Sequence, residues 1–169
     1  VYETVPDTGG PGFYRGGNAL KIGYRFLESG EISIHDDRWL TYPWGVNGGL
    51  PGGRSSKVME RRDGTVEHLI SKCDHIKVDE GDLLYFVTWG GGGWGDPLTR
   101  DADLVALDVR RGLVTVDGAK RYGVVLDPNL SVDRGATEAL RAKMAEDRGE
   151  TLIFDKGGTI DELKARCKE

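Results

Sequence analysis

The sequence lacks the features that mark several large classes of protein. No run of apolar residues approaches the roughly 20 that a membrane-spanning helix requires. No long basic block is present and the formal net charge is −5, which disfavours binding to nucleic-acid phosphates. The first residues, Val1-Tyr2-Glu3, contain neither an initiator methionine nor an apolar secretory leader. We therefore expect a cytoplasmic chain, processed or excised from something longer, that binds neither nucleic acid nor a membrane.

Cysteine and histidine are also scarce. Cys73 and Cys167 lie far apart, which favours two free thiols in a reducing compartment over the alternative of one long-loop disulfide. The run His35-Asp36-Asp37 is a weak metal site, because adjacent carboxylates diverge or face water. The run Cys73-Asp74-His75 is a weak catalytic pair, because such pairs usually come from separate elements. We assign no metal ligand to this chain and leave its catalytic residues unknown.

The common catalytic and nucleotide-binding motifs are missing as well. The sequence contains no GxSxG, HExxH or CxxC. Gly90 to Gly95 matches G-x-G-x-x-G only through repetition, without the following helix or the acidic residue about 20 positions on. No GK[ST] of a phosphate-binding loop follows it. We therefore exclude both kinds of nucleotide site.

What the sequence does have is glycine, at 26 of 169 residues, together with tryptophan, tyrosine and phenylalanine. The aromatic residues argue against disorder. The glycines gather in three clusters that also contain aromatic residues and arginine: 7–17, 42–54 and 89–96. Glycine runs are useful where the backbone must approach another group closely or adopt a positive φ. We interpret the three clusters as one shaped surface.

Alternating apolar residues predict an α+β fold with a mainly antiparallel β-body and C-terminal helices. Strands over 20–26 and 32–35 are predicted to form a hairpin, and so are 58–62 and 65–69, joined by an Asp-Gly type I′ turn. A third pair joins 76–78 to 83–88, and the latter strand should be central because it is apolar on both faces.

Beyond Pro97 the pattern becomes helical. A helix capped by Asp101 should run to about Arg111, and a short one over 115–122 should be closed by Gly123. Residues 124–126 form either one more strand or an extended tail. After Pro128 we expect helices only, one from about 132 to Gly149 and one begun by a capping box of Thr159 and Glu162.

The chemistry left to such a chain is that of its backbone and a few charged side chains. Glycine-rich loops can direct N–H groups at an anion or a developing oxyanion, and Arg15, Arg54 and Arg100 lie beside the clusters. Asp7 and Asp96 are candidate acids, with turn capping as the alternative role. The predicted substrate-binding residues are Arg15, Trp44, Gly91, Gly92, Gly93 and Asp96.

Together these residues resemble the C-terminal part of the hydantoinase B/oxoprolinase family. The similarity runs from residue 1 to about 127, in one order, and rests on several separate segments: 7–17, 24–27, 37–38, 43–49, 51–52, 81–82, 90–98, 100–101, 105, 108, 112–114 and 122–126. We divide the chain on this basis into a hydantoinase B-like β-rich module, 1–127, and a helical tail, 128–169, that serves as a docking element.

The resemblance implies an ATP-dependent enzyme of two components. The A component phosphorylates a carbonyl oxygen with ATP, and the B component hosts hydrolysis of the activated cyclic amide, as in hydantoin or 5-oxoproline opening. Relatives among the acetone and acetophenone carboxylases trap the activated species with bicarbonate-derived carbon instead. Two alternative functions lie outside the enzyme class. The chain is then either a non-catalytic assembly module or a free-standing ligand-binding β-domain.

This chain departs from the family in its length. B components are several times longer, and their metal-binding His and Asp residues lie in an N-terminal part that has no counterpart here. ATP and a divalent metal are therefore expected in larger hydantoinase A-like and B-like partner subunits, and this chain is expected to be inactive alone.

Overall fold

The computed structural model describes residues 1–167. Its strands are β1 (Tyr2–Val5), β2 (Ala19–Arg25), β3 (Gly30–His35), β4 (Gly45–Val46), β5 (Ser56–Glu60), β6 (Val66–Leu69), β7 (Lys72–Val78), β8 (Leu83–Val87) and β9 (Phe154–Asp155). Its α-helices are α1 (Ala102–Arg110), α2 (Arg134–Asp147) and α3 (Ile160–Arg166), and short 3-10 helices cover Pro97–Thr99 and Gly118–Tyr122. All strand pairs within the sheets are antiparallel, so the predicted α+β class is confirmed. No helix among residues 1–167 is long and apolar enough to cross a membrane.

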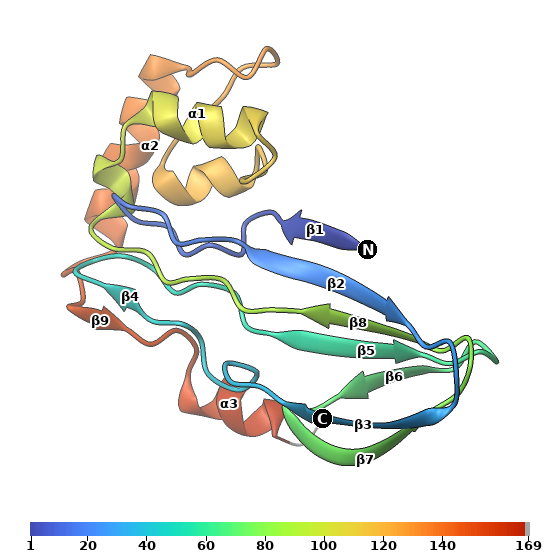
Figure 1. The fold of residues 1–169 in the computed structure, drawn as a ribbon. Coiled ribbons are helices and arrows are strands. Elements are labelled where there is room, and N and C mark those ends of the chain that lie inside the picture. The colour runs from blue at the N-terminus through green and yellow to red at the C-terminus, as the bar shows by residue number, and fades with distance from the viewer. Residues whose placement is uncertain (168–169) are drawn as a thin grey trace.

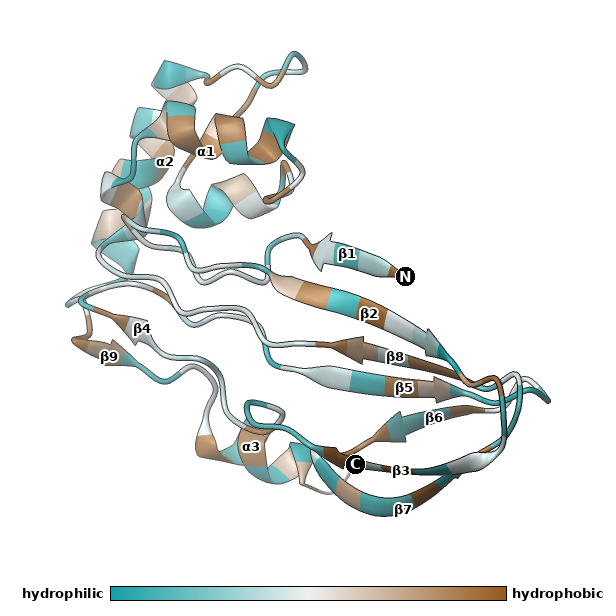
Figure 2. Cartoon of the chain, viewed as in Figure 1, coloured by the Kyte–Doolittle hydropathy of each residue, from teal (hydrophilic) through white to brown (hydrophobic). Residues whose placement is uncertain are grey.

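The main sheet has five strands in the order β1-β2-β8-β5-β6 (Figure 1). The prediction that the apolar strand β8 is central is confirmed, and the strand is mostly brown in Figure 2. Of the five residues of β8 only Leu84 is buried and the others are half-buried, so the strand is central in the sheet without being fully covered on both faces.

Two of the three predicted strand pairs are wrong. β2 does not pair with β3, because β1 and β8 occupy its two edges. β7 does not pair with β8, because β8 lies between β2 and β5. β3 and β7 instead pair with one another as a separate ribbon against the main sheet. Ile34, Met59, Val78 and Leu84 are the buried residues that join the two.

The remaining predicted hairpin, β5 with β6, is confirmed, but its turn is not of type I′. A type I′ turn needs positive φ at both central residues. Only Gly64 has it, at 89°, while Asp63 does not. The N–H of Gly64 donates to the Arg61 carbonyl and that of Arg61 to the Thr65 carbonyl, so a tight turn is followed by a left-handed glycine.

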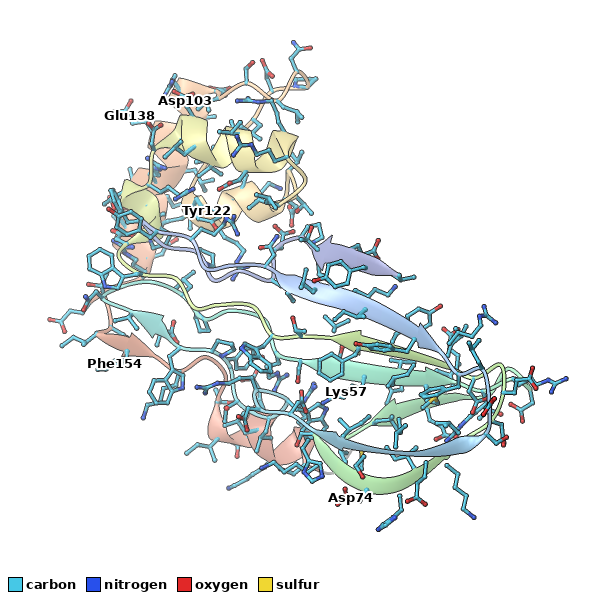
Figure 3. All side chains as sticks on the ribbon, viewed as in Figure 1. Lys57, Asp74, Asp103, Tyr122, Glu138 and Phe154 are labelled. Atoms are coloured by element: carbon cyan, nitrogen blue, oxygen red, sulfur yellow. The ribbon has the colours of Figure 1, made fainter. Side chains whose placement is uncertain are left out.

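The helices form a second apolar core, separate from that of the sheet. Val105, Val109, Tyr122 and Val124 are among its buried residues, and Tyr122 is labelled in Figure 3. The Asp101 carboxylate caps α1, and Gly123 ends the second 3-10 helix with φ 64°, as predicted. Residues 124–126 form no strand; Leu126 makes one isolated bridge to Val132.

The tail is not wholly helical, which corrects the prediction for the residues after Pro128. α2 and α3 are present, and both hydrogen bonds of the Thr159–Glu162 capping box form. Between these helices, however, β9 pairs with β4, with Gly45 opposite Asp155 and Val46 opposite Phe154. The tail therefore returns along the second glycine cluster instead of projecting from the molecule (Figure 1).

Candidate functional site

The three glycine clusters interlock between the sheet and the helical core. The N–H of Gly10 donates a hydrogen bond to the Gly91 carbonyl over 2.8 Å. The N–H of Gly53 donates to the Thr8 carbonyl over 2.7 Å, and the N–H of Gly90 donates to the Gly53 carbonyl over 3.0 Å. The first segment therefore donates to the third, the second to the first, and the third to the second. This closed cycle of backbone hydrogen bonds confirms that the clusters form one unit, which we call the glycine core (segments 8–17, 43–53 and 90–95).

Close approach of backbones, not positive φ, is what the glycine run at 90–93 provides. None of Gly90 to Gly93 has a positive φ. A Cβ atom at Gly90, Gly92 or Gly93 would lie well under 3.0 Å from a carbonyl oxygen of a neighbouring segment. Real Cβ atoms essentially never come that close. Any larger residue at these positions would push the segments apart.

The N–H groups of the run are largely used inside the core. Those of Gly90, Gly91 and Gly93 donate to the carbonyls of Gly53, Gly17 and Leu50. An anion or oxyanion site needs N–H groups that are free to point at the ligand. These three N–H groups therefore build a wall and do not form an anion cradle.

Asp96 lies at the end of the glycine core and holds the tail. Its two carboxylate oxygens accept from Nη1 and Nη2 of Arg148, at 2.5 and 2.6 Å, and one of them also caps the N–H of Leu98. The hydrogen bonds from Arg148 hold the pKa of the Asp96 carboxyl below its usual value of 3.8. The group is thus a carboxylate near neutral pH, which suits a cap and an ion-pair partner and not a general acid.

Arg15 is anchored to the first long helix. Its Nε lies 3.4 Å from Oδ2 of Asp108 in α1, and Arg100 reaches the same oxygen at 2.9 Å. The Arg15 Nη1 also donates to the Gly16 carbonyl and to Oδ1 of Asn18. Asp108 is nearly buried, and two arginines compensate its charge. Arg15 therefore fixes the glycine core to the helical core in this structure.

Trp44 lies in a small group of rings at one end of the glycine core. Its side chain is 46% exposed and its ring centroid lies 6.3 Å from that of Phe154 in β9. The backbone of Trp44 abuts the run at Gly92, whose missing Cβ leaves room for the Trp44 carbonyl. Two predicted site residues, Trp44 and Gly92, are thus brought together, while Arg15 is directed to α1.

The remaining candidates, Asp7, Arg54 and Arg100, take structural roles. Asp7 accepts from the N–H and hydroxyl of Thr115. The Arg54 guanidinium stacks over the ring of Tyr42 at 4.4 Å. Arg100 donates to the Phe13 carbonyl. These contacts are structural, but those of Asp7 and Arg100 join distant segments of the chain and are not the turn capping that was the alternative for Asp7.

Neither short histidine run forms a site in the described part of the chain. His35 Nε2 lies 2.8 Å from Asp74, and His75 Nδ1 lies 2.6 Å from Glu31, both on the surface. Cys73 and Cys167 are free thiols, as predicted. Burial raises the pKa of the Cys73 thiol, which makes it less reactive. Among residues 1–167 no three His, Cys, Asp or Glu side chains lie together as a metal site would require.

A cavity of about 240 Å³ lies between the glycine core and the tail. Its wall is mostly apolar and includes Leu50, Leu98, Met144 and Leu152, with Arg121 and Arg148 also lining it. The cavity exists because β9 and the Asp96–Arg148 pair bring the tail against Gly48 and Gly49. Sequence reasoning missed Arg148 and Phe154, and it included Asp108 only as one position of the family resemblance, without its role. Each of the three acts through a partner distant in sequence.

The glycine core and the sheet that carries it lie within a segment matched by a known family. The Hydantoinase B/oxoprolinase model matches residues 1–97. The chain belongs to the Hydantoinase B/oxoprolinase family. The predicted resemblance is thereby confirmed.

Relatives of this chain within the family are much longer. The caprolactamase subunit beta of Pseudomonas jessenii is 34% identical over 147 residues, which cover 83% of this chain and 25% of the relative. The crystal structure of the ATP-dependent caprolactamase from that organism has a TM-score of 0.68 at 32% identity, covering 84% of this chain and 25% of the other. The acetone carboxylase alpha subunit of Xanthobacter autotrophicus is 28% identical, covering 83% and 23%. The chain thus spans about a quarter of the length of these relatives.

Proposed function

We propose that this chain is a module or small subunit of an ATP-dependent cyclic-amide hydrolase and that its glycine core forms one wall of the reaction cavity. The observation that carries the proposal is the likeness to caprolactamase subunit beta, which extends over 83% of this chain, together with the interlocked glycine core. The substrate class is a lactam or related cyclic amide. Arg15, Trp44, Gly91, Gly92, Gly93 and Asp96 are the residues proposed to line or support that wall.

The chemistry of such an enzyme explains why a wall of this kind is useful. An amide carbonyl is a poor electrophile, and phosphorylation of its oxygen makes the carbon open to attack by water. The activated species is labile, so the cavity must control when water enters. The backbone groups of the glycine core are already hydrogen-bonded to one another, so such a wall needs no reorganisation during the reaction. For the same reason it has few free polar groups that could bind water. The glycine core meets both requirements.

ATP and the divalent metal belong, in this proposal, to partner polypeptides. The described residues hold no cluster of metal-ligating side chains, and three N–H groups of the glycine run are already bonded to carbonyls. These groups do not fit a phosphate or a metal ion. No step of the reaction is therefore assigned to a cofactor on this chain, and larger hydantoinase A-like and B-like subunits would supply it.

The division into a module at 1–127 and a docking tail at 128–169 stays a proposal, as does a cytoplasmic location. The contacts of the tail with β4 and Asp96 show where its described part lies on this chain. They support a tail that supplements the glycine core.

The test is turnover by the assembled enzyme. The complex containing this chain would be purified from its native source and given ATP with caprolactam, 5-oxoproline or a hydantoin. The expected result is ring opening coupled to ADP release. An assembled complex that opens none of these rings in the presence of ATP would overturn the proposal.

A carboxylase is the second candidate, because the acetone carboxylase alpha subunit is a relative over 83% of this chain. Both reactions begin with an activated oxygen and differ in what attacks next. Isotope-labelled bicarbonate given to the same complex separates them. Label in the product indicates carboxylation, whereas an unlabelled ring-opened amino acid indicates hydrolysis.

A non-catalytic assembly module is the third candidate, supported by the three internally bonded N–H groups of the glycine run. Replacing Gly92 or Gly93 cannot test it, because a Cβ at either would collide with backbone. Gly91 is the better position, since the nearest atom to its Cβ would lie 3.1 Å away. A Gly91→Ala complex that assembles but has an altered KM or kcat supports a wall at the site. If the Gly91→Ala complex and the Gly17→Ala complex both keep the KM and kcat of the wild type, a structural role is supported.

A further inference from the structure

The three glycine clusters and the tail end in one small four-stranded arrangement. Tyr14 pairs with Trp94 in antiparallel fashion, Trp94 pairs with Val46 in parallel fashion, and Val46 pairs with Phe154 across β4 and β9. Directly paired residues in a sheet place their side chains on the same face. Tyr14, Trp94, Val46 and Phe154 therefore form one row that crosses all four segments.

Ring contacts confirm this placement. The ring centroids of Tyr14 and Trp94 are 5.7 Å apart. Trp44, two residues before Val46 and so on the same face, lies 6.3 Å from Phe154. We call Tyr14, Trp44, Val46, Trp94 and Phe154 the aromatic face; Figure 3 labels Phe154 at its β9 edge.

The aromatic face is open to solvent in the isolated chain. Tyr14 is 62% exposed, Phe154 55% and Trp94 48%. Grouped exposed rings of this kind are unusual on a monomer and are typical of the centre of a protein interface. The glycine core beneath holds the strands rigidly, so docking here would cost little conformational entropy.

We infer that the aromatic face is the docking surface for the rest of a hydantoinase B-type polypeptide, the three quarters of such a chain that these residues do not span. The inference rests on the proposed function, since that function requires such a polypeptide. This occupant is favoured because the relatives carry a matching quarter and the larger remainder in one chain, so that the remainder is tethered to this module and available to cover an exposed face. It is also favoured because the aromatic face draws on all three glycine clusters, the segments that the proposed function places at the reaction cavity.

The test compares this chain alone with the assembled native enzyme by hydroxyl-radical footprinting and mass spectrometry. Oxidation of Tyr14, Trp94 and Phe154 should fall at least about fivefold on assembly, because rings at an interface centre lose nearly all contact with water. Tyr24 and Leu104, which are 51% and 47% exposed, are matched controls and should be oxidised at nearly the same rate in both samples.

Variants give a second and independent measurement. Trp94→Ser and Tyr14→Ser should weaken association with the larger polypeptide at least about tenfold, whereas Tyr24→Ser should not, because hot-spot rings carry most of the binding free energy. Circular dichroism of each variant checks that it is folded.

The outcomes separate this inference from the proposed function. Rings that stay fully reactive in the assembled enzyme overturn the inference even if the enzyme opens lactams. Rings protected in a concentrated sample of the chain alone, and exposed on dilution, overturn it in favour of a second copy. Rings protected in a complex that has no ATP-dependent activity overturn the proposed function and leave the docking surface in place.

Discussion

Arg148 and Asp96 form a two-pronged ion pair that closes the C-terminal tail onto the glycine core. Nη1 and Nη2 of the arginine lie 2.5 and 2.6 Å from the two carboxylate oxygens. A few residues after Arg148, the carbonyls of Leu152 and Ile153 accept hydrogen bonds from the N–H groups of Gly48 and Asn47, each over 2.8 Å. The ion pair and the backbone hydrogen bonds therefore both hold residues 148–153 of the tail against the glycine core.

Arg148→Met should loosen this attachment while leaving the Asp96 cap of Leu98 intact. The pair is partly exposed, so its loss should cost about 1 kcal/mol. Amide hydrogen exchange at Asn47 and Gly48 should therefore become roughly fivefold faster. Arg134→Met, which removes the exposed pair with Asp103, is the matched control and should leave both amides unchanged. Equal exchange in wild type and Arg148→Met would show that the backbone bonds alone hold the tail.

The same ion pair predicts a dependence on pH. Arg148 lowers the pKa of Asp96 in the folded chain, so the carboxylate binds a proton less readily there than in the unfolded chain. The stabilisation is then fully present above the ordinary value of 3.8 and is lost as the pH falls through the lower folded pKa. The free-energy difference between wild type and Arg148→Met should be constant from pH 7 to about 4 and shrink below that. A difference that grows on acidification would contradict the assignment.

Features that depend on neighbours in the chain could be predicted from the sequence. Asp101 caps α1 and Thr159 pairs with Glu162 because the groups involved lie within four residues. The central place of β8 followed from its composition, since a strand that is apolar on both faces needs cover on both.

Features that depend on distant pairing were beyond the sequence. Nothing local shows that β1 and β8 occupy both edges of β2, so the hairpin of 20–26 with 32–35 was the natural but wrong expectation. Asp96 and Arg148 are 52 residues apart. Phe154 lies in a tail whose pattern read as helical, and it meets Val46 only because β9 pairs with β4.

Two glycine substitutions should differ sharply although the chemical change is the same. Gly92→Ala would place a Cβ against the Trp44 carbonyl and separate two segments of the glycine core, at a cost of at least about 3 kcal/mol. Gly17→Ala meets no heavy atom within 4 Å and has no positive φ, so it should change stability by less than about 0.5 kcal/mol. Urea denaturation followed by tryptophan fluorescence measures both. Similar midpoints for the two variants would show that the segments are not in the close contact described.

A buried ion pair under the main sheet provides the last prediction. Lys57, labelled in Figure 3, has a fully buried side chain that bonds Asp36 and lies over the ring of Phe86 at 5.4 Å. The other Asp36 oxygen accepts from the Ser55 hydroxyl at 2.5 Å. Lys57→Met would leave a buried carboxylate without its cation, so it should destabilise the fold by about 3–5 kcal/mol.

Removing both charges should be much less harmful than removing one. In Lys57→Met/Asp36→Leu no uncompensated charge remains, and the apolar side chains fill similar volume, so at least about half of the lost stability should return. Lys120→Met is the control, because its pair with Asp117 is exposed and its loss should cost less than about 0.5 kcal/mol. Chemical denaturation of the four proteins, wild type included, provides the comparison. A double variant as unstable as Lys57→Met would mean that packing around Lys57, and not its charge, is what the fold requires.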